Sequence, residues 1–243
     1  MLKVENLRKS FGGVVATSDV SIDFVAGSLS AVIGPNGAGK TTFFNLISGG
    51  LQPDSGRILL DGEDIVGLPS SEIVRKGIGR AFQVAKLFKS LTVEESLRAA
   101  LQSPLGQSLQ MRGRFPTAQT RDRAHEVMEQ LGLQDKADVV SGNLSHGDQK
   151  LLDIALALVL KPKVLLLDEP VAGMTEAETE RTVELIASLR SPQRAIVVVE
   201  HDMEFVEHVA DLVSVLHEGR LLGEGSMQAV RANPKVIQVY LGR

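Results

Sequence analysis

The residues with the clearest chemical spacing lie between Gly34 and Thr42, where the sequence reads G-P-N-G-A-G-K-T-T. This matches the pattern G-x-x-x-x-G-K-[ST] of a phosphate-binding loop, whose glycines let successive backbone N–H groups point at phosphate oxygens. Lys40 is expected to reach the β- and γ-phosphates of a nucleotide, and Thr41 carries a hydroxyl suited to Mg²⁺. The residues expected to contact the nucleotide are Gly34, Pro35, Asn36, Gly37, Ala38, Gly39, Lys40, Thr41 and Thr42.

A second pattern, V-L-L-L-D-E-P, runs from Val164 to Pro170. A buried strand that ends here places Asp168 at the carboxyl edge of a sheet, where ligands of open α/β folds bind. We expect Asp168 to orient Mg²⁺ through its water shell, and Glu169 to act as the general base that polarises an attacking water. An acidic pair after a strand can also serve only as the negative charge at the start of a helix. Beside a complete phosphate loop, the catalytic interpretation is favoured.

The third pattern is L-S-H-G-D-Q-K, from Leu144 to Lys150. A serine at a helix N-cap with a glycine nearby makes an anion-binding helix end. The segment resembles the signature L-S-G-G-Q of the ATP-binding cassette (ABC) family, in which the signature of one subunit closes over the ATP held by another. The resemblance implies that Ser145 donates to the γ-phosphate and that Gly147 allows close backbone approach. His146 and Asp148 depart from the signature, and their roles are left open.

Three further positions match the ABC pattern. Gln83, in R-A-F-Q, occupies the place of the Q-loop glutamine, which implies contact with Mg²⁺ and the attacking water and coupling to a membrane partner. His201, after A-I-V-V-V-E, matches the switch histidine that contacts the γ-phosphate. Phe11, in K-S-F-G-G, lies where the family has an aromatic ring stacked on adenine. A plain core position is the alternative for Phe11.

Other motifs narrow the resemblance. Thr175 ends the loop V-A-G-M-T after Pro170, where an aspartate is common in the family. The chain is similar to ATPases of branched-chain amino acid and amide importers, most of all the urea type. This similarity rests on V-A-G-M-T together with L-S-H-G, V-V-E-H-D-M and the ending V-I-Q-V-Y-L-G-R. This resemblance implies hydrolysis of ATP to ADP and phosphate that powers uptake through permeases.

The resemblance also implies partners. The signature faces outward from the subunit that holds the ATP, so two subunits, identical or paralogous, are expected to meet head to tail. Permease subunits would contact the chain near Gln83, and an extracytoplasmic substrate-binding protein would deliver the cargo. The longest apolar stretch, Leu151 to Leu160, contains Asp153 and is too short to span a bilayer. The chain is therefore expected to lie peripherally at the cytoplasmic face of the inner membrane.

These residues need a sheet to bring them together. Continuous apolar runs at 29–33, 164–167 and 195–199 predict buried parallel strands, whereas alternation in the first thirty residues predicts antiparallel ones. The expected fold is α/β, a P-loop (RecA-like) core with a mainly parallel sheet, an N-terminal antiparallel β-subdomain and an inserted helical subdomain. Helices are expected at 41–48, 176–189 and 234–241, and a hairpin at 214–225.

The sequence changes in character between about residues 86 and 159. Two polar, alanine-containing segments have helical character, and Thr92 with Glu95 forms a capping-box pattern at the first of them. The segment 103–116 between them predicts a loop. We therefore expect a single nucleotide-binding domain over residues 1–243, with a core of 1–85 and 160–243 and a helical subdomain of about 86–159.

Composition excludes several classes of protein. The 243 residues include 26 basic and 30 acidic side chains, a formal charge of −4, which disfavours a nucleic-acid partner. The chain contains 0 cysteines, so disulfides, thiolate metal sites and cysteine nucleophiles are excluded. A soluble ABC ATPase outside transport, such as a cofactor-assembly factor, and a P-loop small-molecule kinase are the alternatives. The cargo, and whether the dimer pairs identical chains, are left open.

Overall fold

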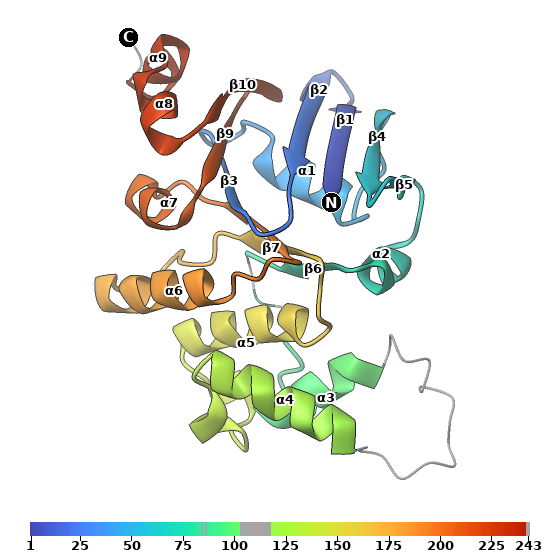
Figure 1. Ribbon diagram of the computed structural model, residues 1–243, viewed down its shortest axis with the longest axis vertical. Helices are drawn as coiled ribbons and strands as arrows, with labels where there is room; N and C mark the ends of the chain where they lie inside the picture. The colour runs from blue at the N-terminus through green and yellow to red at the C-terminus, as the bar shows by residue number, and fades with distance from the viewer. Residues whose placement is uncertain (84, 86, 103–117, 242–243) are drawn as a thin grey trace.

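The computed structural model describes residues 1–83, 85, 87–102 and 118–241. In this part of the chain the strands form two sheets, with helices on both sides of the larger one (Figure 1). The smaller sheet is antiparallel, with the order β2-β1-β4-β5, and confirms the expected N-terminal β-structure. Its strands are β1 (Leu2–Phe11), β2 (Val14–Phe24), β4 (Ser55–Leu60) and β5 (Glu63–Asp64).

The alternation in β1 contains an irregularity with a structural cause. Val4 and Leu7 are three residues apart, yet both side chains are fully buried. The pairing register between β1 and β2 shifts between these two residues, and Asn6 adopts a left-handed φ of 47°. A bulge of this kind adds one residue to a strand, which returns Leu7 to the buried face.

The larger sheet has the order β10-β9-β3-β8-β7-β6. All its pairs are parallel except the hairpin of β9 and β10. Every residue of β3, β7 and β8 is buried, as the continuous apolar runs predict. Because parallel strands end at a common edge, the residues after β3, β6, β7 and β8 come together. The strands are β3 (Leu29–Ile33), β6 (Ile78–Ala81), β7 (Val164–Asp168), β8 (Ala195–Val199), β9 (Leu212–His217) and β10 (Arg220–Gly225).

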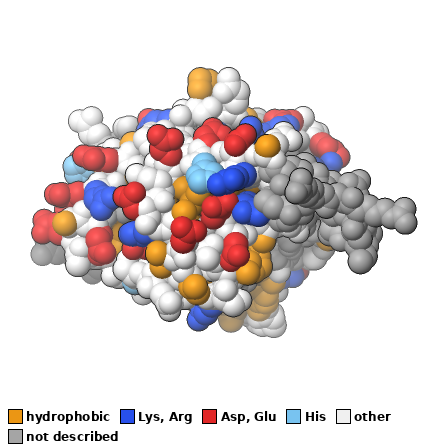
Figure 2. All heavy atoms as spheres, turned by 90° about the horizontal axis from the view of Figure 1, so that it is seen from below, with side chains coloured by type: hydrophobic (Ala, Val, Ile, Leu, Met, Phe, Trp, Pro, Cys, Tyr) orange, Lys and Arg blue, Asp and Glu red, His pale blue; other side chains and the backbone are white. Residues whose placement is uncertain are grey.

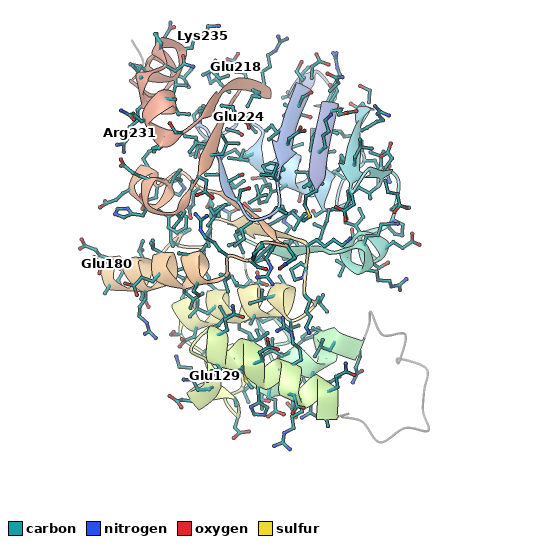
Figure 3. All side chains as sticks on the ribbon, in the orientation of Figure 1. Glu129, Glu180, Glu218, Glu224, Arg231 and Lys235 are labelled. Atoms are coloured by element: carbon teal, nitrogen blue, oxygen red, sulfur yellow. The ribbon has the colours of Figure 1, made fainter. Side chains whose placement is uncertain are left out.

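Helices cover both faces of this sheet, and two hydrophobic clusters lie under them. The helices predicted at 41–48, 176–189 and 234–241 are confirmed, with bounds that differ by at most one residue. Figure 3 labels Arg231 and Lys235 on the two C-terminal helices, which lie beside β10. The helices are α1 (Lys40–Ile47), α2 (Ser70–Lys76), α6 (Glu176–Ser188), α7 (Met203–Val209), α8 (Met227–Ala232) and α9 (Pro234–Leu241).

The region between β6 and β7 is helical, as expected, and contains α3 (Val93–Gln102), α4 (Ala118–Gln130) and α5 (His146–Leu158). The capping box before α3 is confirmed, because the Thr92 and Glu95 side chains each accept the other's backbone N–H. In Figure 1, α5 lies between the larger sheet and the pair α3 and α4. The loop predicted at 103–116 lies outside the described residues, and the subdomain boundaries stay a prediction.

Figure 2 views the end that carries α3 and α4, where acidic and basic side chains are interspersed. In the portion of the chain that the structure describes, no helix is long and apolar enough to cross a membrane.

Candidate functional site

The phosphate loop joins the buried strand β3 to helix α1, in the context that the sequence predicts. Gly39, the N-cap of α1, has a left-handed φ of 99°, and a Cβ at this position would lie 2.2 Å from the Ala16 carbonyl oxygen. A Cβ at Gly34 would lie 2.2 Å from the Leu216 carbonyl oxygen. Any larger residue would therefore push the loop away from β2 and β9. Asn36, Gly37 and Thr41 are exposed along the loop, whereas Pro35, Ala38 and Thr42 are more buried.

Lys40 is the first residue of α1, and its side chain turns back over the loop. Its ammonium donates to the carbonyl oxygens of Gly34, at 2.6 Å, and Pro35, at 3.1 Å. Burial lowers the pKa of Lys40, while the nearby carboxylates of Glu169 and Asp168 act to raise it. The side chain thus places a buried positive charge over the phosphate loop at the start of α1, a suitable arrangement for an anion.

Asp168 is the last residue of β7, and its carboxylate is buried. Arg80, on the neighbouring strand β6, donates to Asp168 Oδ2 at 2.7 Å. The same guanidinium also donates to Asn45 and Ser48 in and after α1. Sequence reasoning missed Arg80, which fixes the orientation of the carboxylate expected to face Mg²⁺.

Three residues from separate loops meet next to Asp168. Gln83 Nε2, after β6, donates to Glu169 Oε2 at 2.7 Å. His201 Nδ1, after β8, lies 3.9 Å from Glu169 Oε1. The Glu169 carboxylate is thus flanked by an amide on one side and by an imidazole on the other. The structure thus brings together Gln83, Glu169 and His201, which lie more than thirty residues apart in the sequence; their roles as Q-loop glutamine, general base and switch histidine stay predictions.

Glu200 is a further buried carboxylate at this edge, and the sequence analysis did not select it. It follows β8 directly and is 0% exposed. Its oxygens accept the backbone N–H of Val171 and His201. Burial raises the pKa of Glu200, and these backbone hydrogen bonds oppose the shift. The sequence feature that could have identified Glu200 is its position immediately after the unbroken apolar strand 195–199.

The signature segment forms the start of α5. The Ser145 hydroxyl accepts the backbone N–H of Asp148 and donates to its carboxylate, so Ser145 is the N-cap that the sequence predicts. Asp148 is also bonded to Lys136, so its two carboxylate oxygens accept from the Ser145 hydroxyl and the Lys136 ammonium. Ser145 and His146 are exposed. A Cβ at Gly147 would lie 3.1 Å from Glu178 Oε1, so the backbone there is closely packed.

Phe11 ends β1 and is 46% exposed, which is inconsistent with a plain core position. The Lys9 ammonium lies 5.6 Å from the centre of its ring. A ring exposed on one face can stack on a planar ligand.

The described residues include no group of three or more His, Cys, Asp or Glu side chains that could hold a metal ion. Mg²⁺ needs no such group when phosphate oxygens and water supply most of its ligands. The hydroxyl of Thr41, the carboxylate of Asp168 and the amide of Gln83 are oxygen donors of the required kind. The set fits Mg²⁺ bound together with a nucleotide.

A phosphate loop at the start of a helix, with carboxylates at the ends of adjacent parallel strands, defines a P-loop nucleotide-binding site. A family model described as "ABC transporter" matches residues 17–172, and one described as "Branched-chain amino acid ATP-binding cassette transporter" matches residues 220–243. The chain belongs to the ABC transporter family. It is an ATP-binding ATPase of the branched-chain amino acid transport type.

Individual relatives are similar to this chain over nearly its whole length, in sequence and in structure. The high-affinity branched-chain amino acid transport ATP-binding protein LivG of Escherichia coli K12 is 40% identical over 100% of this chain and 98% of its own length. A nucleotide-free ATP-binding cassette from an ABC transporter superposes with a TM-score of 0.88 at 30% identity, over 100% of this chain and 99% of that one. A dimeric cassette in a post-hydrolysis state, bound to ADP and phosphate, has a TM-score of 0.79 at 26% identity, over 93% of this chain and 99% of that one.

Proposed function

We propose that this chain is the motor subunit of an ABC importer, in which ATP binding and hydrolysis power uptake through partner permeases. The observation that carries this proposal is the meeting of Gln83, Glu169 and His201 beside the phosphate loop. A base between an amide and an imidazole, close to a phosphate site, is suited to direct a water at a γ-phosphate.

In this proposal, the residues of the phosphate loop bind the ATP. Backbone N–H groups of 34–42, which Pro35 alone lacks, and the Lys40 ammonium hold the β- and γ-phosphates, and Phe11 stacks on the adenine. Thr41, Gln83 and Asp168 would hold Mg²⁺, which supplies charge neutralisation at the phosphates when bound. Arg80 keeps the Asp168 carboxylate in one orientation.

Glu169 is the proposed general base. Its carboxylate takes a proton from the attacking water, while Gln83 and His201 orient the water and the γ-phosphate. His201 and Glu169 lie on different loops, and both would lie close to the γ-phosphate of bound ATP. When hydrolysis removes the γ-phosphate, both loops lose that contact with the nucleotide. Such nucleotide-dependent contacts are the usual basis of switching.

A second subunit completes the proposed site. Ser145, His146 and Gly147 stand at the start of α5, and the first two are exposed and thus accessible to another molecule. Head-to-tail pairing would bring this anion-binding helix end to the ATP of the partner. The similarity to a dimeric cassette supports the pairing. The partner is a second copy of this chain or a paralogue.

The proposed location is peripheral, at the cytoplasmic face of the inner membrane. Transmembrane permease subunits would bind near Gln83, and an extracytoplasmic substrate-binding protein would supply them. The identity to LivG supports a transport assembly over the alternatives, a cofactor-assembly ATPase or a small-molecule kinase.

We propose that the cargo is a branched-chain amino acid or a small amide such as urea. The similarity to LivG supports the amino-acid class. The motifs L-S-H-G, V-A-G-M-T and V-V-E-H-D-M, with the ending V-I-Q-V-Y-L-G-R, support urea. Uptake of labelled leucine and labelled urea, in cells with and without the gene, separates the two. If deletion of the gene reduces neither leucine uptake nor urea uptake, both proposed cargoes are contradicted.

The ATPase role of Glu169 is tested with Glu169→Gln. The variant keeps the shape of the side chain but not the base, so we expect it to bind ATP and to hydrolyse it about 10²- to 10⁴-fold more slowly. Steady-state phosphate release and nucleotide-binding titrations measure the two properties. Lys40→Ala is the matched variant for binding and should lose ATP affinity. Normal turnover by Glu169→Gln contradicts the assignment.

A further inference from the structure

Lys150 is a buried lysine that none of the proposed catalytic steps uses. It lies in the second turn of α5 and is only 5% exposed. Its ammonium donates to the backbone carbonyl oxygen of Glu169 at 2.6 Å. The helix that begins with the signature segment therefore reaches into the nucleotide site of its own chain, at the residue proposed as the base.

The backbone of Glu169 is in a conformation that needs support. Its φ of 48° is in the left-handed region, which a glutamate adopts only when its surroundings impose it. The Glu169 N–H donates to the Val199 carbonyl at 2.9 Å, and the Lys150 ammonium holds the carbonyl on the other side of the residue. The Ala172 N–H also donates to the Glu169 carbonyl oxygen, at 3.2 Å. Together these bonds fix the peptide groups on both sides of the Glu169 Cα, and hence the direction of its side chain.

The charge around Lys150 is consistent with this function. Burial lowers the pKa of Lys150, while Glu200, Glu169, Asp153 and Asp168 act to raise it. A buried ammonium is costly unless hydrogen bonds and opposite charges compensate it. At Lys150 both are present, which suits a donor held in place rather than a mobile surface charge.

We propose that Lys150 is a positioning residue for ATP hydrolysis: by binding the Glu169 carbonyl, it keeps the Glu169 carboxylate between Gln83 and His201. This inference depends on the proposed function of Glu169 as the general base. It predicts that the effect of Lys150 on turnover passes through Glu169 and is lost when the base is absent.

The test uses Lys150→Met in the full chain, because methionine fills a similar volume without a donor. A hydrogen bond from a charged donor corresponds to a factor of about 10 to 100. We expect kcat for ATP hydrolysis to fall by about this factor while KM for ATP changes less than about twofold. Lys150→Arg retains a cationic donor and should restore most of kcat. Lys76→Met, which removes a surface lysine paired with Glu63, is the control and should leave kcat unchanged.

A second comparison separates positioning from simple loss of packing. In the Glu169→Gln background, Lys150→Met should slow the residual single-turnover hydrolysis less than about twofold, because no base remains to be oriented. An equal fold-loss in both backgrounds, a change in KM alone, or an unchanged kcat would overturn the inference. If Lys150→Met does not fold, Lys150→Leu, which also lacks a donor, takes its place in the same comparison. If Glu169→Gln hydrolyses ATP normally, the proposed function fails first, and the two failures are thus distinguishable.

Discussion

Buried charged side chains are concentrated at the carboxyl edge of the larger sheet. Lys40, Lys150, Asp168 and Glu200 are each at most 7% exposed, and the guanidinium of Arg80 lies among them. Burial of one such charge would be costly, but here cations and carboxylates alternate over short distances. The result is a site whose polar groups are fixed before any nucleotide binds, which is the arrangement that favours electrostatic catalysis.

The buried Glu200 should make the free energy of unfolding of the protein depend on pH. Burial raises its pKa in the folded protein, so the folded state holds the proton more tightly than the unfolded chain does. Its contribution to stability is present below the ordinary pKa of glutamate and is lost as the pH rises through the folded-state pKa. Glu200→Gln does not titrate, so its unfolding free energy relative to the wild type should increase as the pH rises above the ordinary pKa of glutamate.

Urea unfolding of the wild type and Glu200→Gln at several pH values measures this difference. Glu129→Gln is a suitable control, because Glu129 is exposed on α4, in the helical region away from the phosphate loop (Figure 3). A constant difference between Glu200→Gln and the wild type, or one that decreases with pH, contradicts the explanation.

At the scale of elements, the unbroken apolar runs and the long periodic helices were predictable, whereas short segments of mixed composition were not. The apolar runs of β3, β7 and β8 identify buried strands, and the polar helices α4 and α6 have clear patterns. By contrast, α2 has seven residues and β6 has four, too few to show a period. They acquire their structure from their neighbours: β6 pairs with β7, and α2 packs beside β6.

Prediction of the site residues from the sequence has the same limit. Motifs identified the residues that follow β3, β7 and β8, because their chemistry depends on local sequence. Arg80 and Lys150 were missed, since nothing local marks a contact with Asp168 or with the Glu169 carbonyl. These contacts depend on the order of strands in the sheet and on the placement of α5, neither of which is written in a short motif.

The start of α6 offers a prediction at this scale. Thr175 is the N-cap and, with Glu178, forms a complete capping box. Thr175→Ala should lower the unfolding free energy by about 1 kcal/mol, because the backbone N–H of Glu178 loses its acceptor. Denaturant unfolding measures the change. The exposed Glu180, labelled on α6 in Figure 3, supplies the control Glu180→Ala, expected to change stability by less than about 0.5 kcal/mol. Equal losses for the two variants would refute the cap.

At the scale of the whole molecule, the exposed signature end of α5 predicts nucleotide-dependent pairing. Glu169→Gln should elute as a dimer in the presence of Mg²⁺ and ATP and as a monomer without them, because uncleaved ATP bridges the two subunits. Light scattering with size exclusion measures the mass. Ser145→Arg, added to this variant, should prevent pairing by obstructing the helix end.

The composition of the dimer determines how this result is interpreted. If the chain pairs only with a paralogue, the dimer should form on co-expression of the two and contain one of each. A monomer with ATP, both alone and with the paralogue, contradicts the pairing.

The strand order has a consequence for synthesis of the protein. β3 leads directly into the phosphate loop, but its two neighbours in the sheet, β8 and β9, begin only at Ala195 and Leu212. A nascent chain that emerges from the ribosome cannot complete the sheet around β3 until most of its length has been translated. During that interval β3 lacks its final neighbours, and this buried apolar strand is a segment on which a chaperone would act.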